Sequence, residues 1–119
     1  MKSGQEWDDN LFQNWISLRA KFRSAKREKD HPAIIAIGMD VIALSERASF
    51  IGIVNALFEY DIAEAHIKSG DTLAAVKYYR RSLDSFQVFR STKKLRNPDD
   101  FLSDIEKIQK KLMKLEDLK

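Results

Sequence analysis

The side chains best suited to chemistry are two histidines and the carboxylates near one of them. Glu59 and Glu64 precede His66, and Glu59 would share its helical face because the two are seven residues apart. A metal site built in this way needs a pair of Glu-x-x-His motifs on two helices, and the sequence offers no such pair. His31 stands in a turn beside Pro32. We therefore interpret His66 as a half-buried histidine that packs against its neighbours.

The motifs of the common enzyme classes are also absent from the sequence. It contains no cysteine, which excludes disulfides, thiol chemistry and cysteine-based zinc sites. It contains no Gly-rich phosphate loop, no nucleophile elbow and no His-Glu-x-x-His run. We therefore predict no catalytic residues, no metal and no cofactor, and a protein that is not an enzyme.

Lysine and arginine gather in one part of the chain. Residues 71–97 carry seven Lys or Arg against two Asp or Glu, whereas residues 31–70 carry two against five. Phosphate contacts need such charges on one surface, so a nucleic-acid-binding accessory protein is the alternative function. No helix-turn-helix, RNA-binding sheet motif or Arg-rich tail accompanies the charges, and a solvated face would explain them equally. The patch would comprise Lys77, Arg80, Arg81, Arg90, Lys93, Lys94 and Arg96.

The composition is that of a single soluble helical domain over residues 1–119. Hydrophobic residues make up 44% of the chain and charged residues 33%, and two prolines with four glycines leave little room for loops. The N-terminal segment lacks the apolar core of a signal peptide. The most apolar segment, residues 50–58, is too short to span a membrane. We expect a cytoplasmic protein without membrane contact.

Apolar spacing and helix-end signals predict five helices, at about 7–29, 32–46, 49–69, 72–91 and 98–117. In the first, Trp7 and Trp15 are expected to pack in the core, with an exposed docking surface as the alternative. Its last turns carry cations that suit the helix dipole, namely Arg23, Lys26, Arg27 and Lys29. The break at 46–49 has no Gly or Pro, so Gly52 is placed inside the third helix, where it would mark a close helix crossing.

The third and fourth helices form the clearest hairpin. Leu57, Tyr60, Ala63 and Ile67 recur at helical spacing before Gly70, and apolar residues do so again after it. Gly70 can take the left-handed conformation that ends a helix, and the residues after it can cap the next one, namely Asp71 or Thr72. A turn this short requires two antiparallel helices in contact.

This hairpin resembles a tetratricopeptide repeat over residues 56–89. The matching residues are Ile62, Ala63, Gly70, Asp71, Ala75, Tyr79, Ser82 and Leu83. His66 and Gln87 stand where the family usually has Tyr and Pro. The preceding hairpin resembles a degenerate repeat, in which Ala36 and Ala43 align with Ala75 and Ser82 at an offset of 39 residues. The resemblance implies an all-α fold of antiparallel hairpins stacked as an α-α superhelix.

Members of this family bind peptides or helices in a concave groove lined mostly by the first helix of each hairpin. The resemblance therefore implies a non-catalytic interaction or adaptor module. With Glu64, Tyr60 and Leu57 in the groove, an apolar or basic partner is expected. Alternatively, the first or the last helix fills the groove. The corresponding groove residues would be Leu57, Tyr60, Glu64, Ile67 and Lys68.

The last predicted helix carries a heptad seam. It comprises Phe101, Ile105, Ile108, Leu112 and Leu115. The simpler role for this helix is to cover the exposed edge of the preceding hairpin, as terminal helices do in repeat arrays. Self-association into a homo-oligomer is the alternative, although a seam of about two heptads is marginal as an isolated coiled coil.

Overall fold

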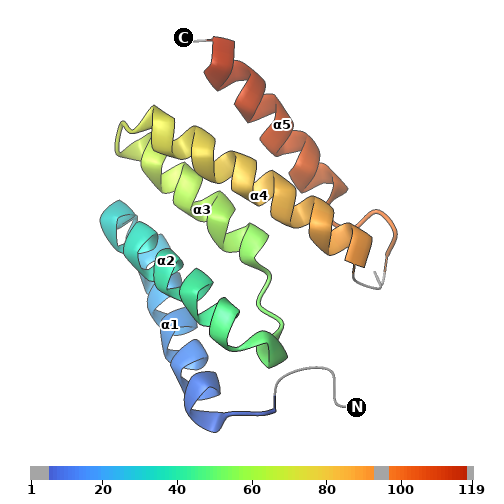
Figure 1. Ribbon diagram of the computed structural model, residues 1–119. Coiled ribbons are helices and arrows are strands. Elements are labelled where there is room, and N and C mark those ends of the chain that lie inside the picture. Colours follow the sequence, from blue (N-terminus) through green and yellow to red (C-terminus); the bar gives the residue numbers. More distant parts are fainter. Residues whose placement is uncertain (1–5, 93–96, 118–119) are drawn as a thin grey trace.

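The computed structural model describes residues 6–92 and 97–117 of the chain, and in these residues all regular structure is helical. Five α-helices follow one another, which confirms the predicted all-α class. Helices α1 and α2 form one hairpin, α3 and α4 form a second, and α5 lies against α4 (Figure 1). Their bounds are α1 (Asp9–Arg27), α2 (His31–Arg47), α3 (Asn55–Lys68), α4 (Thr72–Thr92) and α5 (Leu102–Asp117), with a 3-10 turn, η1 (Ser49–Ile51), after α2.

The second hairpin turns as its sequence predicts. Gly70 takes the left-handed conformation with φ 84°, and its N–H donates to the carbonyl of Ile67 at 3.1 Å. The N–H of Asp71 donates to the carbonyl of His66 at 2.9 Å, which completes a Schellman ending of α3. The carboxylate of Asp71 accepts a hydrogen bond from the N–H of Ala74 at 3.0 Å and so caps α4.

The first hairpin repeats this turn 41 residues earlier in the chain, from Asp71 back to Asp30. Lys29, with φ 56°, occupies the place of Gly70 although a side chain disfavours that conformation. The N–H of Asp30 donates to the carbonyl of Ala25 at 2.9 Å, and its carboxylate accepts from the N–H of Ala33 at 3.2 Å. The two hairpins therefore share one turn geometry.

The offset of 39 residues expected between the hairpins is wrong. Ala36 and Ala43 were aligned with Ala75 and Ser82, yet both are exposed while Ala75 and Ser82 are each fully buried. An offset of 41 residues matches buried positions of α2 with buried positions of α4. At that offset the counterparts of Ala75 and Ser82 are buried residues of α2, namely Ile34 and Val41.

Large and small side chains are exchanged between the two hairpins where their helices cross. The second hairpin buries the small Ala63 against the large Tyr79, whereas the equivalent residues of the first are the large Phe22 and the small Gly38. A Cβ atom on Gly38 would lie only 2.8 Å from Cγ1 of Ile62 and 3.4 Å from the Phe22 ring. Gly38 therefore lets α2 approach α3. Because of the exchange, the small residues of the first hairpin do not align with those of the second.

Helix α3 begins at Asn55 and not, as predicted, at Ser49. After α2 ends, Gly52 closes η1 in the left-handed conformation with φ 72°, which cannot continue a helix. No atom lies within 4 Å of a Cβ built on Gly52, so the close crossing expected there is found at Gly38 instead. The side-chain amide of Asn55 donates to the Ser45 hydroxyl at 2.9 Å and ties α3 back to α2.

Helix α5 likewise begins at Leu102 and not at residue 98. The side-chain oxygen of Asn97 accepts a hydrogen bond from the backbone two residues on, but this closes only a local turn. Phe101 then takes the left-handed conformation with φ 67°, which prevents a helix from starting before it. Its ring is held by two phenylalanines of α4, with centroid distances of 5.1 Å to Phe86 and 5.4 Å to Phe89.

The heptad seam of α5 faces the interior of its own chain. Ile108 is fully buried and Leu112 is 7% exposed, and the other seam residues pack against the core formed by α3 and α4. The predicted covering role of the last helix is confirmed. Self-association through α5 would therefore have to use a different face of that helix. No described helix has both the length and the apolar character needed to cross a membrane.

The two tryptophans of the N-terminal region differ in their surroundings. Trp15 is half-buried and meets the ring of Phe58 at 5.8 Å, as expected of a core residue. Trp7 is 60% exposed and contacts only the edge of the fold, through Phe12 at 4.7 Å and Phe50 at 4.9 Å. The expectation that Trp7 lies in the core is therefore wrong, because α1 begins two residues after it.

Replacing Gly38 with Ala should destabilise the fold by about 1 kcal/mol, because overpacking against Ile62 outweighs the gain in helix propensity. The measurement is chemical denaturation followed by circular dichroism. Ile62→Val removes Cδ1, which would lie 2.9 Å from the new Cβ atom, and keeps Cγ1, so the added cost of Gly38→Ala should be partly reduced in that background. A stabilising effect of Gly38→Ala in both backgrounds would contradict the close crossing.

Truncating Ile108 to Ala should cost about 3 kcal/mol of unfolding free energy, because a fully buried side chain leaves a cavity. Met113 lies on the same helix and is 68% exposed. Met113→Ala should stay within about 0.5 kcal/mol of the wild type. Thermal denaturation of both variants tests the docking of α5, and equally small effects would show that α5 is not held on the core.

Candidate functional site

Two adjoining cavities lie along α1 and α3, and together we call them the α1–α3 groove. One has a volume of about 330 Å³ and the other, nearer to α5, about 260 Å³. Lys26, Tyr60 and Asp61 line both. The first is also lined by Trp15, Arg19, Phe22, Arg23, Leu57 and Phe58, and the second by Lys29, His31, Ile34, Glu64, Ala65, Lys68 and Lys107.

The floor of the groove is aromatic. The Phe58 ring of α3 meets Phe22 with a centroid distance of 4.9 Å and Trp15 at 5.8 Å, both from α1. Phe22 is only 5% exposed, so it is fixed by the core beneath it. Rings held on both sides in this way form a rigid apolar surface at which α1 and α3 meet.

Four of the five predicted groove residues line the α1–α3 groove. Leu57 is 42% exposed, Tyr60 and Glu64 are half-buried, and Lys68 is exposed at the end nearest the hairpin turn. The fifth, Ile67, packs against the core of α3, α4 and α5 and does not line either cavity. The four residues form the α3 side of the two cavities, and their role in binding a partner stays a prediction.

Glu64 is engaged within the chain. The Tyr79 hydroxyl donates to its carboxylate, and Nζ of Lys111 on α5 lies 3.0 Å from the same oxygen. Burial raises the pKa of this carboxyl, but the two hydrogen bonds and the charges of Lys111 and Lys107 outweigh burial and lower it overall. Burial and Glu64 together raise the pKa of Tyr79, so the phenol keeps its proton. Glu64 is charged and already compensated.

Asp61 is compensated as well. Nζ of Lys26 lies 3.1 Å from its Oδ2 atom, which joins α1 to α3 across the groove. Burial raises the pKa of the Asp61 carboxyl, and the hydrogen bond and charge of Lys26 offset only part of this rise. Neither acid of the groove is therefore left without a cation, and the reason for expecting a basic partner is removed.

The cations of the groove outnumber its acids, with six Lys or Arg against these two carboxylates. Nζ of Lys107 lies 5.3 Å from the centroid of the Tyr60 ring, in cation–π contact. Within the described part of the chain, five of the six have no carboxylate at ion-pair distance, namely Arg19, Arg23, Lys29, Lys68 and Lys107.

Sequence reasoning missed the α1 wall of this groove. Arg23, Lys26 and Lys29 were assigned to the helix dipole, and Arg19 was not singled out. The available signal was spacing, because Trp15, Arg19 and Arg23 recur every four residues and so share a helical face. It could not be assigned to a groove without knowing that α3 lies opposite.

The described members of the predicted basic patch serve different contacts. Arg80 pairs with Glu116 of α5 at 2.9 Å, and Arg90 donates to the carbonyl of Asp100. Lys77 and Arg81 lie over the Tyr78 ring, 5.8 and 5.4 Å from its centroid. Arg80 and Arg90 therefore contact α5 and the turn before it, whereas Lys77 and Arg81 contact the Tyr78 ring. The remaining members, Lys93, Lys94 and Arg96, lie outside the described residues.

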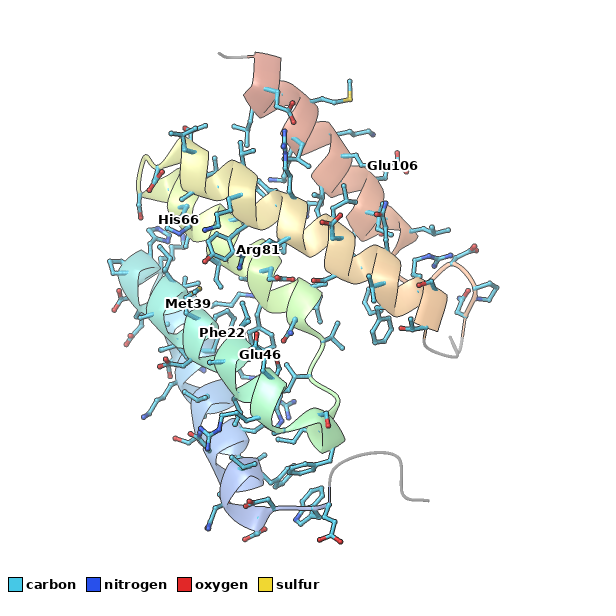
Figure 2. All side chains as sticks on the ribbon, viewed as in Figure 1. Phe22, Met39, Glu46, His66, Arg81 and Glu106 are labelled. Atoms are coloured by element: carbon cyan, nitrogen blue, oxygen red, sulfur yellow. The ribbon has the colours of Figure 1, made fainter. Side chains whose placement is uncertain are left out.

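His66 packs as its sequence context predicted. Its ring stacks on Tyr78 with a centroid distance of 5.7 Å and an interplanar angle of 20°, and it is half-buried (Figure 2). His31 lines the second cavity of the α1–α3 groove, apart from His66. In the described ranges, no three His, Asp or Glu side chains come together in an arrangement that could hold a metal ion.

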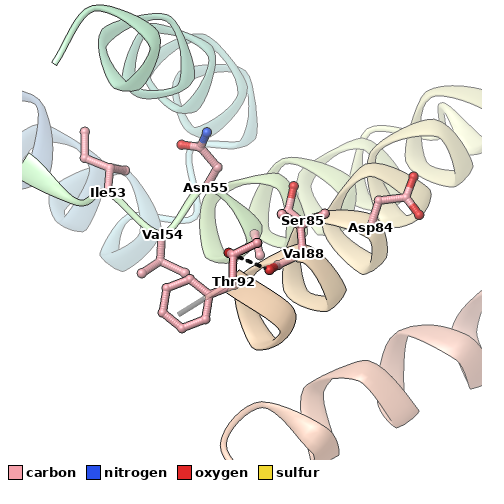
Figure 3. A pocket seen from close by; sticks show the side chains of 9 residues that line it. Ile53, Val54, Asn55, Asp84, Ser85, Val88 and Thr92 are labelled. Carbon is pink, nitrogen blue, oxygen red and sulfur yellow. Dashed lines mark hydrogen bonds between the residues drawn. The ribbon is translucent and has the colours of Figure 1, made fainter. Parts of the chain in front are cut away.

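A third cavity, of about 310 Å³, lies between the start of α3 and the end of α4 (Figure 3). Ile53, Val54 and Asn55 line one side, and α4 supplies Val88, which is 59% exposed. Asp84 is its only charged lining residue in the described chain. This cavity is mostly apolar and no described cation lines it, so it differs in character from the α1–α3 groove.

Comparison with known proteins adds no assignment. No protein-family model, no curated protein and no solved structure matches the chain. The function is therefore argued from the groove itself.

Replacing Glu64 with Gln should change how stability depends on pH. Because its folded pKa lies below its usual value of 4.5, the carboxyl contributes stability that is present above 4.5 and lost as the pH falls through the lowered value. The advantage of the wild type over Glu64→Gln should therefore shrink on acidification, as measured by urea unfolding across pH.

Glu59→Gln supplies a control of opposite sign. Burial raises the pKa of Glu59, and the hydrogen bond from Ser85 and the charge of Arg81 offset only part of this rise. Its contribution to stability is present at low pH and is lost as the pH rises through the raised value. The same pH trend for both variants would contradict the assignment of Glu64.

Proposed function

We propose that the chain is a non-catalytic protein-interaction module that binds a peptide or helix of a partner protein in the α1–α3 groove. The observation that supports this most directly is the groove itself, in which a rigid aromatic floor lies beside the exposed Leu57 and between charged walls. A concave apolar surface with a few polar groups at its edges is the usual form of a ligand site, and helices dock in such grooves through an apolar face.

The repeat character of the chain supports the same proposal. The hairpin turn recurs at 41 residues with the same hydrogen bonds, and α5 covers the end of the second hairpin. Stacked helical hairpins leave the first helix of each pair along one face, and here α1, α3 and Lys107 of α5 meet at the groove. A tetratricopeptide-like adaptor acting in the cytoplasm is the form of this proposal that the residues favour.

Replacing Leu57 with Glu should abolish peptide binding without unfolding the chain, because the side chain is already 42% exposed. The measurement is selection of a random peptide display library on the immobilised full chain. Leu73→Glu introduces the same charge at a site that is 78% exposed and does not line the groove, and it should retain every selected peptide.

Two results would contradict the proposal. One is that the wild-type chain enriches no peptide from the library. The other is that Leu57→Glu keeps the same peptides as Leu73→Glu, which would place binding on another surface. Circular dichroism of both variants checks that each remains folded.

A further inference from the structure

We propose that the partner segment of the α1–α3 groove is an acidic amphipathic helix, with apolar side chains on one face and carboxylates beside them. The inference rests on the proposed function and adds the chemistry of the ligand. It reverses the expectation, drawn from Glu64 alone, that the groove would favour a basic partner.

The unpaired cations of the groove lie at both of its ends. Arg19 and Arg23 stand one turn apart on α1, at the end of the groove that contains Leu57. Lys29 and Lys68 line the end nearest the hairpin turns, on opposite sides of it. Cations thus occur at both ends and on both walls, and among the described residues none of these four has an acidic partner. An acidic segment would meet complementary charge along its length.

The two acids of the groove already have partners within the chain. Asp61 is held by Lys26 at 3.1 Å, and Glu64 by Tyr79 and Lys111. A basic segment would have to displace these contacts and would also meet repulsion from the unpaired arginines. A segment carrying carboxylates needs no such displacement.

The aromatic floor and the spacing of the two arginines indicate the shape of the partner. The floor formed by Trp15, Phe22 and Phe58 requires apolar side chains above it, and Leu57 extends that surface. The guanidinium groups of Arg19 and Arg23 are spaced four residues apart on one helix, which suits carboxylates at the same spacing on a second helix packed alongside. Both requirements are met by an amphipathic helix with acids flanking its apolar stripe.

A single-stranded nucleic acid is less well matched to the same surface. Base stacking needs open ring faces, whereas the half-buried Phe58 already contacts Phe22 and meets Trp15 edge-on at 75°. This packing of the rings favours a protein ligand.

The test uses the most enriched peptide from the display selection and a twin in which each Asp or Glu is replaced by Asn or Gln. Binding to the full chain is measured by fluorescence anisotropy at low and high salt. We expect acidic peptides to be enriched, the twin to bind about tenfold more weakly, and salt to weaken the acidic peptide more than its twin.

A pair of charge-matched double variants then locates the interaction. Arg19→Glu with Arg23→Glu reverses two cations of the groove and should weaken the acidic peptide at least about tenfold. Lys21→Glu with Arg27→Glu makes the same change of net charge on the same helix, at residues that do not line the groove. This control should change affinity by less than about threefold, because exposed distant charges are screened.

Each other outcome has a definite meaning. Enrichment of neutral or basic peptides that Leu57→Glu loses would overturn the acidic ligand and leave the proposed function standing. Equal weakening by the two double variants would also overturn the acidic ligand, because net charge alone would then explain the binding. Enrichment of no peptide would overturn both proposals. Oligothymidylate could also displace the labelled acidic peptide at a lower concentration than the unlabelled peptide does. That result would overturn both proposals in favour of nucleic acid.

Discussion

The close approach of α2 to α3 at Gly38 is the contact on which the rest of the structure depends. With no side chain at Gly38, the fully buried Ile62 of α3 can lie against the backbone of α2. Phe22 of α1 then fills the space beside this crossing and reaches Phe58. The first hairpin is thereby held on the second, and the same rings that close the core become the floor of the α1–α3 groove.

Charge in the groove follows from that packing. Bringing α1 against α3 places Lys26 beside Asp61 and places Arg19 and Arg23 along the groove. On the other side, α5 brings Lys111 to Glu64 and Lys107 over Tyr60. A helix α3 that is acidic by sequence therefore lines a groove with an excess of positive charge, because its neighbours carry more cations than it carries acids.

The docking of helix α5 against α4 has two structural consequences. Its apolar seam completes the core, since Ile108 and Leu112 are buried among residues of α3 and α4. Lys107 and Lys111 of α5 close the groove near Glu64 without filling the end that contains Leu57. The hydrogen bond from Tyr79 to Glu64 links this end to the centre of α4. Covering the core and shaping the groove are thus coupled.

The sequence by itself determined the all-α class and the second hairpin, because Gly70, Asp71 and the apolar spacing of α3 act locally. Only the tertiary structure decided the starts of α3 and α5, where Gly52 and Phe101 take left-handed conformations. It also decided the true repeat offset, which the exchange of large and small side chains concealed. Most of all, the tertiary structure decided the sign of the net charge in the groove. That sign depends on which helices lie opposite one another, and the spacing of residues within one helix does not show which helices these are.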